Sequence, residues 1–499
     1  MGPAPPGAAI AETHCGVVFF VGDRAFKLKK PVDLGFLDFR ERQARERACR
    51  QEVDLNRRFS PDVYLGVADV HGPDGTVCDH LVVMRRMPSD RRLSTLVAAR
   101  VPVDEALRAT ARTLAAWHAR APRGPEISAA GRRDALLGRW TESFDQVRPF
   151  HGRAIDAAEA AEIEARARDF LAGRAPLFDA RIADGRVVDG HGDLLADDIF
   201  CLDDGPRILD CLEFDDRLRS LDGLDDATFL AMDLERLTAP EPAERFMHWY
   251  CEFAADPAPP SLRHHYVAYR AFVRAKVACL RHAQGDPKAA AEAGTLAEVA
   301  LRHLRAGAVG LILVGGLPGT GKTTLAGAIA DRLGCTLLSS DRIRKELAGL
   351  APDAPATAAY GTGIYTSEWS RRTYAELTRR ARRLLGMGET VVLDASWTSK
   401  DHRDPITGLA HKQRAELHAL RCEAPSAVTI ERLRTRRHLM SDADKHIAEA
   451  LAESAAPWPE AATIDSSGPL DESLDQALAI VRPHGAEHVW HRRPRISRD

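Results

Sequence analysis

One run of residues in this chain has the spacing of a phosphate-binding loop. From Gly316 to Thr323 the sequence reads G-x-x-x-x-G-K-T, with apolar residues 309–314 before it and 325–330 following in helical period. A strand, a loop and a helix in this order are the setting that such a loop requires. Glycines allow backbone N–H groups to turn toward phosphate oxygens, and the start of the helix adds positive potential. The run therefore predicts a nucleoside triphosphate site rather than a turn without function.

The fixed positions of the loop have defined expected roles. Lys322 is expected to reach the β- and γ-phosphates, and the Thr323 hydroxyl to hold Mg²⁺. Asp394 ends the apolar run 391–393 and would act on the same metal, directly or through water. The nucleotide-binding residues expected here are Gly316, Gly319, Thr320, Gly321, Lys322, Thr323 and Thr324.

Two residues after the next predicted strand could act on an acceptor. Asp341 follows the strand candidate 336–340, and the C-termini of strands in a doubly wound sheet face the ligand crevice. Asp341 is therefore placed to take a proton from an acceptor hydroxyl, or to cap the helix that begins there; both roles are compatible. Arg344, one helical turn later, would hold an anionic group.

Arginines gather between residues 432 and 437. Phosphoryl transfer needs positive charge over the γ-phosphate, and a closing lid commonly supplies it. Arg432 and Arg436 are spaced by four, so they share one helix face and are the expected lid arginines. The alternative is a solvated helix face, because the 69 basic residues of the chain include only 10 lysines.

A second group of acidic residues lies in the N-terminal half. Asp193 belongs to an H-x-D sequence, Asp198 follows five residues later, and Asp210 ends a short strand 12 residues beyond that. This is the layout of a protein-kinase-like active site. Asp193 would accept the proton of an acceptor, while Asp198 and Asp210 would hold Mg²⁺. Upstream candidates for phosphate contact and for its support are Lys27, Lys29 and Glu52.

The elements that must position these residues differ between the two halves. In the C-terminal half, strand candidates alternate with helices, which implies a parallel sheet covered on both faces, an α/β doubly wound fold. The N-terminal half begins with a hairpin pattern at 15–30 and becomes mainly helical at 225–303, an α+β pattern. The strand candidates of the C-terminal half are 309–315, 336–340, 390–395, 416–422 and 463–466.

We therefore expect two domains, at residues 12–305 and 309–482. The basic segment 483–499 that follows is expected to fray in solvent, with a nucleic-acid-binding arm as the alternative.

Four sequence segments resemble the small P-loop kinases over about residues 309–480. They are G-x-P-G-x-G-K-T-T, S-S-D-x-x-R, V-V-L-D-A-S-W, and R-L-x-x-R followed by S-D-A-D. This group includes gluconate kinase-like, zeta-toxin-like, chloramphenicol-phosphotransferase-like and polynucleotide-kinase-like domains. The resemblance implies an arginine near the substrate after the strand that ends at Asp394, and Arg403 is the matching candidate.

The segment from Phe26 to Phe39, the H-G-D-L sequence and L-E-F at 212–214 carry a wider resemblance. They are similar to bacterial proteins that fuse an aminoglycoside-phosphotransferase-like domain, with a kinase-like fold, to a P-loop kinase domain. This resemblance spans about residues 12–480. In that pattern H-x-R-N usually follows H-G-D-L, whereas this chain has an aspartate, Asp198, at the asparagine position.

The additional negative charge at Asp198 must be offset near the phosphates. Three interpretations of the N-terminal half stay open: an active kinase, a nucleotide- or ligand-binding regulatory module, and an unrelated structural loop.

The composition narrows the class of protein. A hydrophobic fraction of 45%, a charged fraction of 28% and a net charge of −3 are ordinary for a globular protein and provide no strong field toward nucleic acid or an anionic membrane. The nine cysteines show no C-x-x-C spacing, which favours a reducing compartment. No apolar run reaches the ~18 residues of a membrane span, and residues 1–12 lack the pattern of a signal peptide.

The sequence thus predicts a cytoplasmic ATP- and Mg²⁺-dependent kinase that acts on a small hydroxylated acceptor. The alternative is a regulatory ATP-binding switch with a degenerate kinase-like domain. A nucleic-acid 5′-end kinase would need a basic channel, and the near-neutral net charge argues against one.

Overall fold

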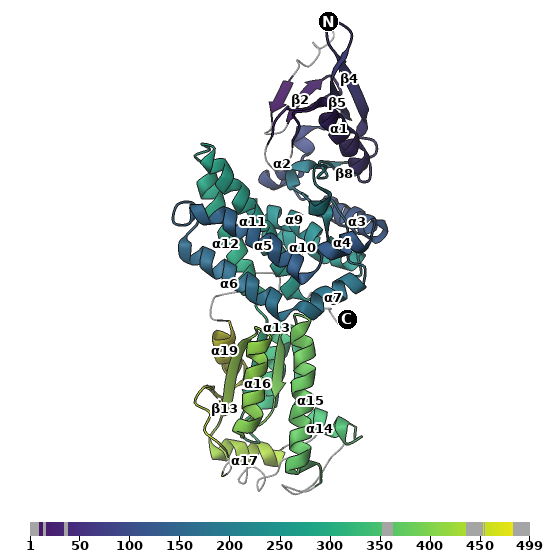
Figure 1. Cartoon of the computed structure of the whole chain (residues 1–499). Coiled ribbons are helices and arrows are strands. Elements are labelled where there is room, and N and C mark those ends of the chain that lie inside the picture. Colours follow the sequence, from purple (N-terminus) through teal and green to yellow (C-terminus); the bar gives the residue numbers. More distant parts are fainter. Residues whose placement is uncertain are drawn as a thin grey trace. The chain divides into compact units, whose positions relative to one another are not determined.

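The computed structural model describes residues 9–12, 16–33, 38–351, 363–435, 453 and 455–482, and the chain divides into two compact units (Figure 1). The first unit consists of residues 1–162, 178–258 and 266–302. The second consists of residues 163–177, 259–265 and 303–499, and so includes two short segments from within the predicted N-terminal domain.

The first unit begins with a five-stranded antiparallel sheet in the order β1-β2-β3-β5-β4. The turn between β2 and β3 contains Gly22, whose φ of +60° favours glycine. Helix α1 packs on the sheet and buries Cys49 and Val53 against Tyr64 and Val82. The bounds are β1 Ala9–Glu12, β2 Gly16–Val21, β3 Arg24–Lys29, α1 Arg42–Asn56, β4 Tyr64–His71 and β5 Val77–Arg85.

Helices and two small hairpin sheets follow the five-stranded sheet. Strand β6 pairs with β9 and strand β7 with β8, both antiparallel, and the buried helix α9 follows β9 directly. The helices are η1 Ser89–Arg91, α2 Leu93–Ala98, α3 Asp104–Arg120, α4 Pro125–Ala130, α5 Arg133–Val147, η2 Arg148–Phe150, α6 Ala157–Gly173, α7 Ala175–Ala183, η3 Ala196–Asp198, α8 Asp216–Arg219, α9 Gly223–Arg236, α10 Pro240–Phe253, α11 Pro260–Ala283 and α12 Ala289–Ala306. The strands are β6 Val187–Asp189, β7 Ile199–Leu202, β8 Gly205–Ile208 and β9 Ser220–Asp222.

The second unit is built on a parallel five-stranded sheet in the order β11-β12-β10-β13-β14. Helices α13 and α19 pack together on one face, and α14, α15 and α16 form the layer on the other (Figure 1). The strands are β10 Gly310–Gly315, β11 Thr336–Ser339, β12 Val391–Asp394, β13 Glu416–Glu423 and β14 Ala462–Asp465. The helices are α13 Lys322–Leu333, α14 Ser340–Leu347, η4 Gly363–Tyr365, α15 Ser367–Gly386, α16 Lys400–Lys412, α17 Ser426–Thr435 and α19 Leu470–Val481.

The fold class predicted from the sequence is confirmed. An antiparallel sheet with helices forms the first unit, and a doubly wound parallel sheet forms the second. Strand β10 is central, and the chain leaves it first toward β11 and later toward β13, so its carboxyl end lies where the strand order reverses. Ligands bind at this position in open α/β sheets.

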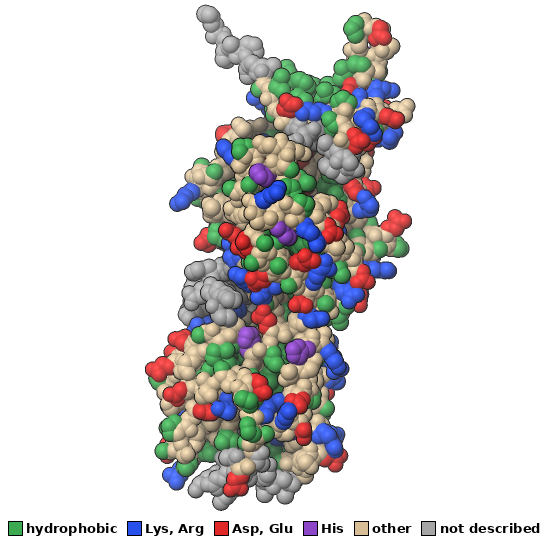
Figure 2. Space-filling model, turned by 60° about the vertical axis from the view of Figure 1, so that its left-hand side comes forward, with side chains coloured by type: hydrophobic (Ala, Val, Ile, Leu, Met, Phe, Trp, Pro, Cys, Tyr) green, Lys and Arg blue, Asp and Glu red, His purple; other side chains and the backbone are tan. Residues whose placement is uncertain are grey.

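On the face drawn in Figure 2, basic and acidic side chains are interspersed rather than gathered by sign. None of the helices in the described part of the chain combines the length and the apolar character of a membrane span.

Candidate active sites

The predicted phosphate loop connects β10 to α13 at the carboxyl end of the central strand. Gly316 and Gly319 have φ values of +138° and +84°, a backbone region that favours glycine. A Cβ atom on Gly316 would lie 2.7 Å from the Cys422 carbonyl oxygen, and one on Gly319 would lie 2.8 Å from the Thr429 carbonyl oxygen. Both glycines are therefore required by backbone conformation and by close neighbours. Lys322 opens α13, so backbone N–H groups that no helical carbonyl satisfies surround it.

A hydroxyl and a carboxylate meet beside this loop. The Thr323 hydroxyl donates to Oδ2 of Asp394 at 3.0 Å, and Asp394 is buried at the end of β12. Strand register explains this contact, because Asp394 is the direct neighbour of Val314 near the end of β10. Two such oxygens fit Mg²⁺, which prefers hard oxygen ligands and takes its others from phosphates and water. Among the described residues no group of three or more His, Cys, Asp or Glu side chains could hold a metal ion.

Helix α17 places an arginine next to the loop. A Cβ atom on Gly321 would lie 3.5 Å from Nη1 of Arg432. This nitrogen is buried and has no hydrogen-bond partner among the described residues. Arg432 therefore lies beside the loop with a buried nitrogen directed at no described acceptor. Arg436, the other predicted lid arginine, lies outside the described residues.

Asp341 and Arg344 lie on α14, with an aromatic residue against both. The Tyr365 hydroxyl donates to Oδ1 of Asp341 at 3.3 Å, and the Arg344 guanidinium lies 4.8 Å from the Tyr365 ring centroid. Buried Lys345 approaches Oδ2 of Asp341 at 3.4 Å. The N-cap of α14 is Ser339, so Asp341 lies within the first turn and does not occupy the capping position considered for it.

Arg403 has a different environment from the one expected. Its side chain is buried and donates to the carbonyl oxygens of Trp397 at 2.8 Å and Pro457 at 2.7 Å. These contacts fix the segment after β12 and give no support to the substrate contact that the sequence resemblance implied.

In the first unit, two lysines of β3 converge on one glutamate of α1. Lys27 Nζ lies 2.9 Å from Oε1 of Glu52 and 2.6 Å from Oδ1 of Asp210. Lys29 Nζ lies 2.5 Å from Oε2 of Glu52 and also pairs with Glu213. The network joins the sheet, α1 and the segment after β8, and it brings together Lys27, Lys29, Glu52 and Asp210.

The charges in this network reinforce one another. Burial lowers the pKa of Lys27, but the charges of Asp210, Glu52 and Glu213 outweigh burial and raise that pKa well above its ordinary value. Lys27 in turn lowers the pKa of Asp210. Both side chains are therefore ionised at neutral pH, as contact with a phosphate and with a metal ion requires.

The segment that carries Asp193 and Asp198 is fixed by two buried aspartates of α9. Asp226 accepts the backbone N–H groups of His191 at 2.7 Å and Gly192 at 2.9 Å, and Asp233 accepts the N–H of Ala196 at 2.9 Å. His118 of α3 lies 3.0 Å from Asp226. Sequence reasoning missed Asp226 and Asp233, although an apolar helix with buried-face aspartates was a signal that could have revealed them.

The two acidic residues on this segment have shifted pKa values. Burial raises the pKa of Asp193. Burial, followed by the charges of Asp210 and Asp193, raises the pKa of Asp198 well above its ordinary value. The charges of Asp210 and Asp193 thus add to burial in disfavouring the ionised form of Asp198.

The loop and parallel sheet of the second unit define a P-loop nucleotide-binding fold, and residues 311–457 match the family model described as an AAA domain. This match confirms the P-loop resemblance inferred from the sequence. Over 477 residues, 96% of each chain, the protein is 42% identical to the uncharacterized protein Rv2004c of Mycobacterium tuberculosis. It has the same identity and coverage with the uncharacterized protein Mb2027c of Mycobacterium bovis. The chain belongs to the family of these mycobacterial proteins.

Two of the solved structures that are similar to parts of the chain have titles that name kinases. A gluconokinase from Sinorhizobium meliloti is 21% identical, covers 34% of this chain and 90% of its own, and has a TM-score of 0.25. A choline/ethanolamine kinase family protein from Mesorhizobium loti is 14% identical, covers 61% of this chain and 94% of its own, and has a TM-score of 0.38.

Proposed function

We propose that the protein is an ATP-dependent phosphotransferase whose second unit transfers the γ-phosphoryl group of ATP to a hydroxyl of a small acceptor. The observation that carries this proposal is the 3.0 Å contact between Thr323 and Asp394 beside the phosphate loop. It supplies the two protein oxygens that a nucleotide-bound Mg²⁺ needs at that place.

The remaining side chains of the site supply charge and a base. Lys322 and Arg432 stabilise the negative charge on the transferred phosphoryl group. Asp341 accepts the proton of the acceptor hydroxyl, and Lys345 lies 3.4 Å from its carboxylate. Arg344, flat against Tyr365, holds a polar or anionic group of the acceptor.

The test measures ATP consumption and phosphate transfer by the purified full chain with sugars, polyols, aminoglycosides and nucleosides as acceptors. Lys322→Ala should lose ATP binding by the second unit and, with it, transfer. Asp341→Asn should lose transfer and retain ATP affinity, because Asp341 does not contact the nucleotide in the proposed arrangement. If the chain binds ATP tightly and transfers phosphate to no acceptor, the regulatory-switch alternative replaces the kinase.

A second candidate function rests on the network of Lys27, Glu52 and Asp210 in the first unit. We propose that this unit binds a second nucleotide, with Lys27 on its phosphates, Asp198 and Asp210 on its metal ion, and Asp193 as the base for an acceptor. The Asp193→Asn variant tests transfer by this unit. Loss of transfer to different acceptors in Asp193→Asn and Lys322→Ala would indicate two kinases on one chain. An Asp193→Asn variant with every transfer intact would limit the first unit to binding.

A further inference from the structure

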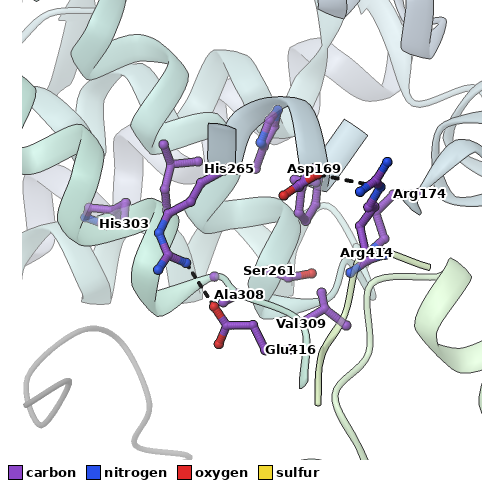
Figure 3. Close-up of a pocket in the computed structure, with 13 residues that line it drawn as sticks. Asp169, Arg174, Ser261, His265, His303, Ala308, Val309, Arg414 and Glu416 are labelled. Carbon is purple, nitrogen blue, oxygen red and sulfur yellow. Dashed lines mark hydrogen bonds and ion pairs between the residues drawn. The ribbon is translucent and has the colours of Figure 1, made fainter. Parts of the chain in front are cut away.

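The second unit contains a cavity of about 80 Å³ away from the phosphate loop (Figure 3). Its walls come from the C-terminal part of α6, the start of α11, the end of α12 and the first residue of β13. It also includes Val309, directly before β10. The cavity therefore lies at the amino end of the central strand, whereas the phosphate loop lies at its carboxyl end.

Two arginines that line the cavity have carboxylate partners. Arg166 lies 3.0 Å from Glu416, and Arg414 lies 3.6 Å from Asp169; Figure 3 marks both pairs with dashed lines. Each pair is charge-balanced, so the two acidic residues in the wall are matched by these two arginines.

Arg174 is the third arginine of the wall, and its environment is different. Only 1% of its surface is exposed, and no ion pair with a carboxylate is found for it among the described residues. Its Nη1 donates to the Gln413 carbonyl oxygen at 2.5 Å, while its Nε is buried without a hydrogen-bond partner in the described part of the chain. Burial lowers the pKa of Arg174 to about 10, which still leaves the guanidinium charged at neutral pH.

The histidine beside it adds no second charge. His265 is stacked on Phe170 with the ring centroids 4.4 Å apart, and burial lowers the pKa of His265 to about 3. The wall therefore combines two arginine–carboxylate pairs, neutral aromatic surface and the guanidinium of Arg174, for which the described residues provide no carboxylate partner.

A buried charge without a counter-ion is costly, and a guanidinium presents several donors in a fixed plane that suits an oxyanion. We propose that this cavity is a binding site for a small oxyanion, a phosphate or carboxylate group, which Arg174 binds through its guanidinium. The cavity volume of about 80 Å³ is several times the ~10–15 Å³ that a cavity needs to hold one water molecule, which leaves room for a group of a few heavy atoms. The site does not depend on the kinase function proposed above.

Calorimetric titration of inorganic phosphate into the full chain tests this site. All proteins carry Lys322→Ala, which removes the phosphate loop as a competing site, and ionic strength is held constant with chloride. Adding Arg174→Met should weaken phosphate binding at least tenfold. Arg382→Met makes the same change of charge at an exposed position of α15 and should leave the affinity unchanged.

Arg174→Lys retains the charge, so it still tests the site if the Arg174→Met variant does not fold. It should weaken phosphate binding several-fold, because the planar set of donors is lost. A parallel titration with acetate separates a carboxylate ligand from a phosphate ligand. The proposal is wrong if Lys322→Ala protein binds neither anion, or if neither Arg174 variant changes the affinity.

Discussion

Lys27 and Lys29 lie two residues apart on β3, but they meet different surroundings. Lys29 is 1% exposed and is enclosed by Glu52 and Glu213. Lys27 reaches Asp210, whose side chain is 48% exposed. Lys27 is therefore the lysine that can contact a nucleotide phosphate, whereas Lys29 holds Glu52 in place.

The two lysines should respond differently to substitution by methionine. Lys29→Met removes one partner of buried Glu52 and should lower the free energy of unfolding by about 3–5 kcal/mol. Lys27→Met should mainly abolish nucleotide binding by the first unit. Urea unfolding and nucleotide titration, both in Lys322→Ala protein, measure the two effects. The reverse pattern would assign the phosphate contact to Lys29.

His265 should make stability depend on pH. Burial lowers its pKa to about 3 in the folded chain, against about 6.5 when unfolded. The folded state therefore binds fewer protons, and the contribution of His265 to stability is complete above pH 6.5 and is lost as the pH falls toward 3. At pH 5 this loss is about 2 kcal/mol.

The variant His265→Phe keeps an aromatic ring against Phe170 and removes the titrating group. As the pH is lowered from 7.5 to 5, the free energy of unfolding of the wild type should fall more than that of His265→Phe. Urea unfolding at the two pH values measures both. His411→Phe, at an exposed position of α16, is the control. Parallel losses of stability in wild type and His265→Phe would contradict the prediction.

Only one face of helix α17 lies against the phosphate loop. Arg432 has a buried Nη1 near Gly321, whereas Arg434 on the same helix is exposed. Arg432→Ala should lower kcat about 10³-fold, as removal of an arginine from the transferred phosphoryl group does, with little change in ATP affinity. Arg434→Ala should have kcat close to that of the wild type. Equal effects of the two variants would support the alternative that the arginines of α17 form a solvated helix face.

The elements of the second unit could be predicted well from the sequence. The five strand candidates agree with β10 to β14 within one or two residues, most directly for β10 and β12, which are buried throughout and form continuous apolar runs. The same strands allow the site residues to be predicted, since the loop with Thr323 comes after β10 and Asp394 ends β12. Their contact is a consequence of strand register, which local spacing does not encode.

The first unit was harder to predict for a physical reason. Its acidic residues were recognised from spacing, but the aspartates that fix them, Asp226 and Asp233, lie on a helix some 30 residues later in the chain. Aspartates within an otherwise apolar helix suggest buried hydrogen bonds, but the spacing of residues does not reveal which distant backbone N–H groups they accept. Arg403 is a different case, since the motif implied substrate contact for a side chain that in the structure donates to backbone carbonyl oxygens.

At the scale of the whole chain, the two units should bind nucleotide independently. A non-hydrolysable ATP analogue should bind wild-type protein with a stoichiometry of about two, and Lys322→Ala or Lys27→Met protein with about one. The double variant should show no binding. Calorimetry measures these numbers, and a wild-type stoichiometry of one would restrict nucleotide binding to a single unit.

The second unit takes residues 163–177 and 259–265 from far upstream of its sheet. During synthesis these segments leave the ribosome well before β10 exists, so they must wait for more than a hundred residues to be added before Arg166 can meet Glu416. A gene fragment that starts at residue 303 would encode the phosphate loop and every strand of its sheet, but not these segments. Such a fragment is therefore expected to be less stable than the second unit of the full chain, because it lacks Arg166 as the partner of Glu416.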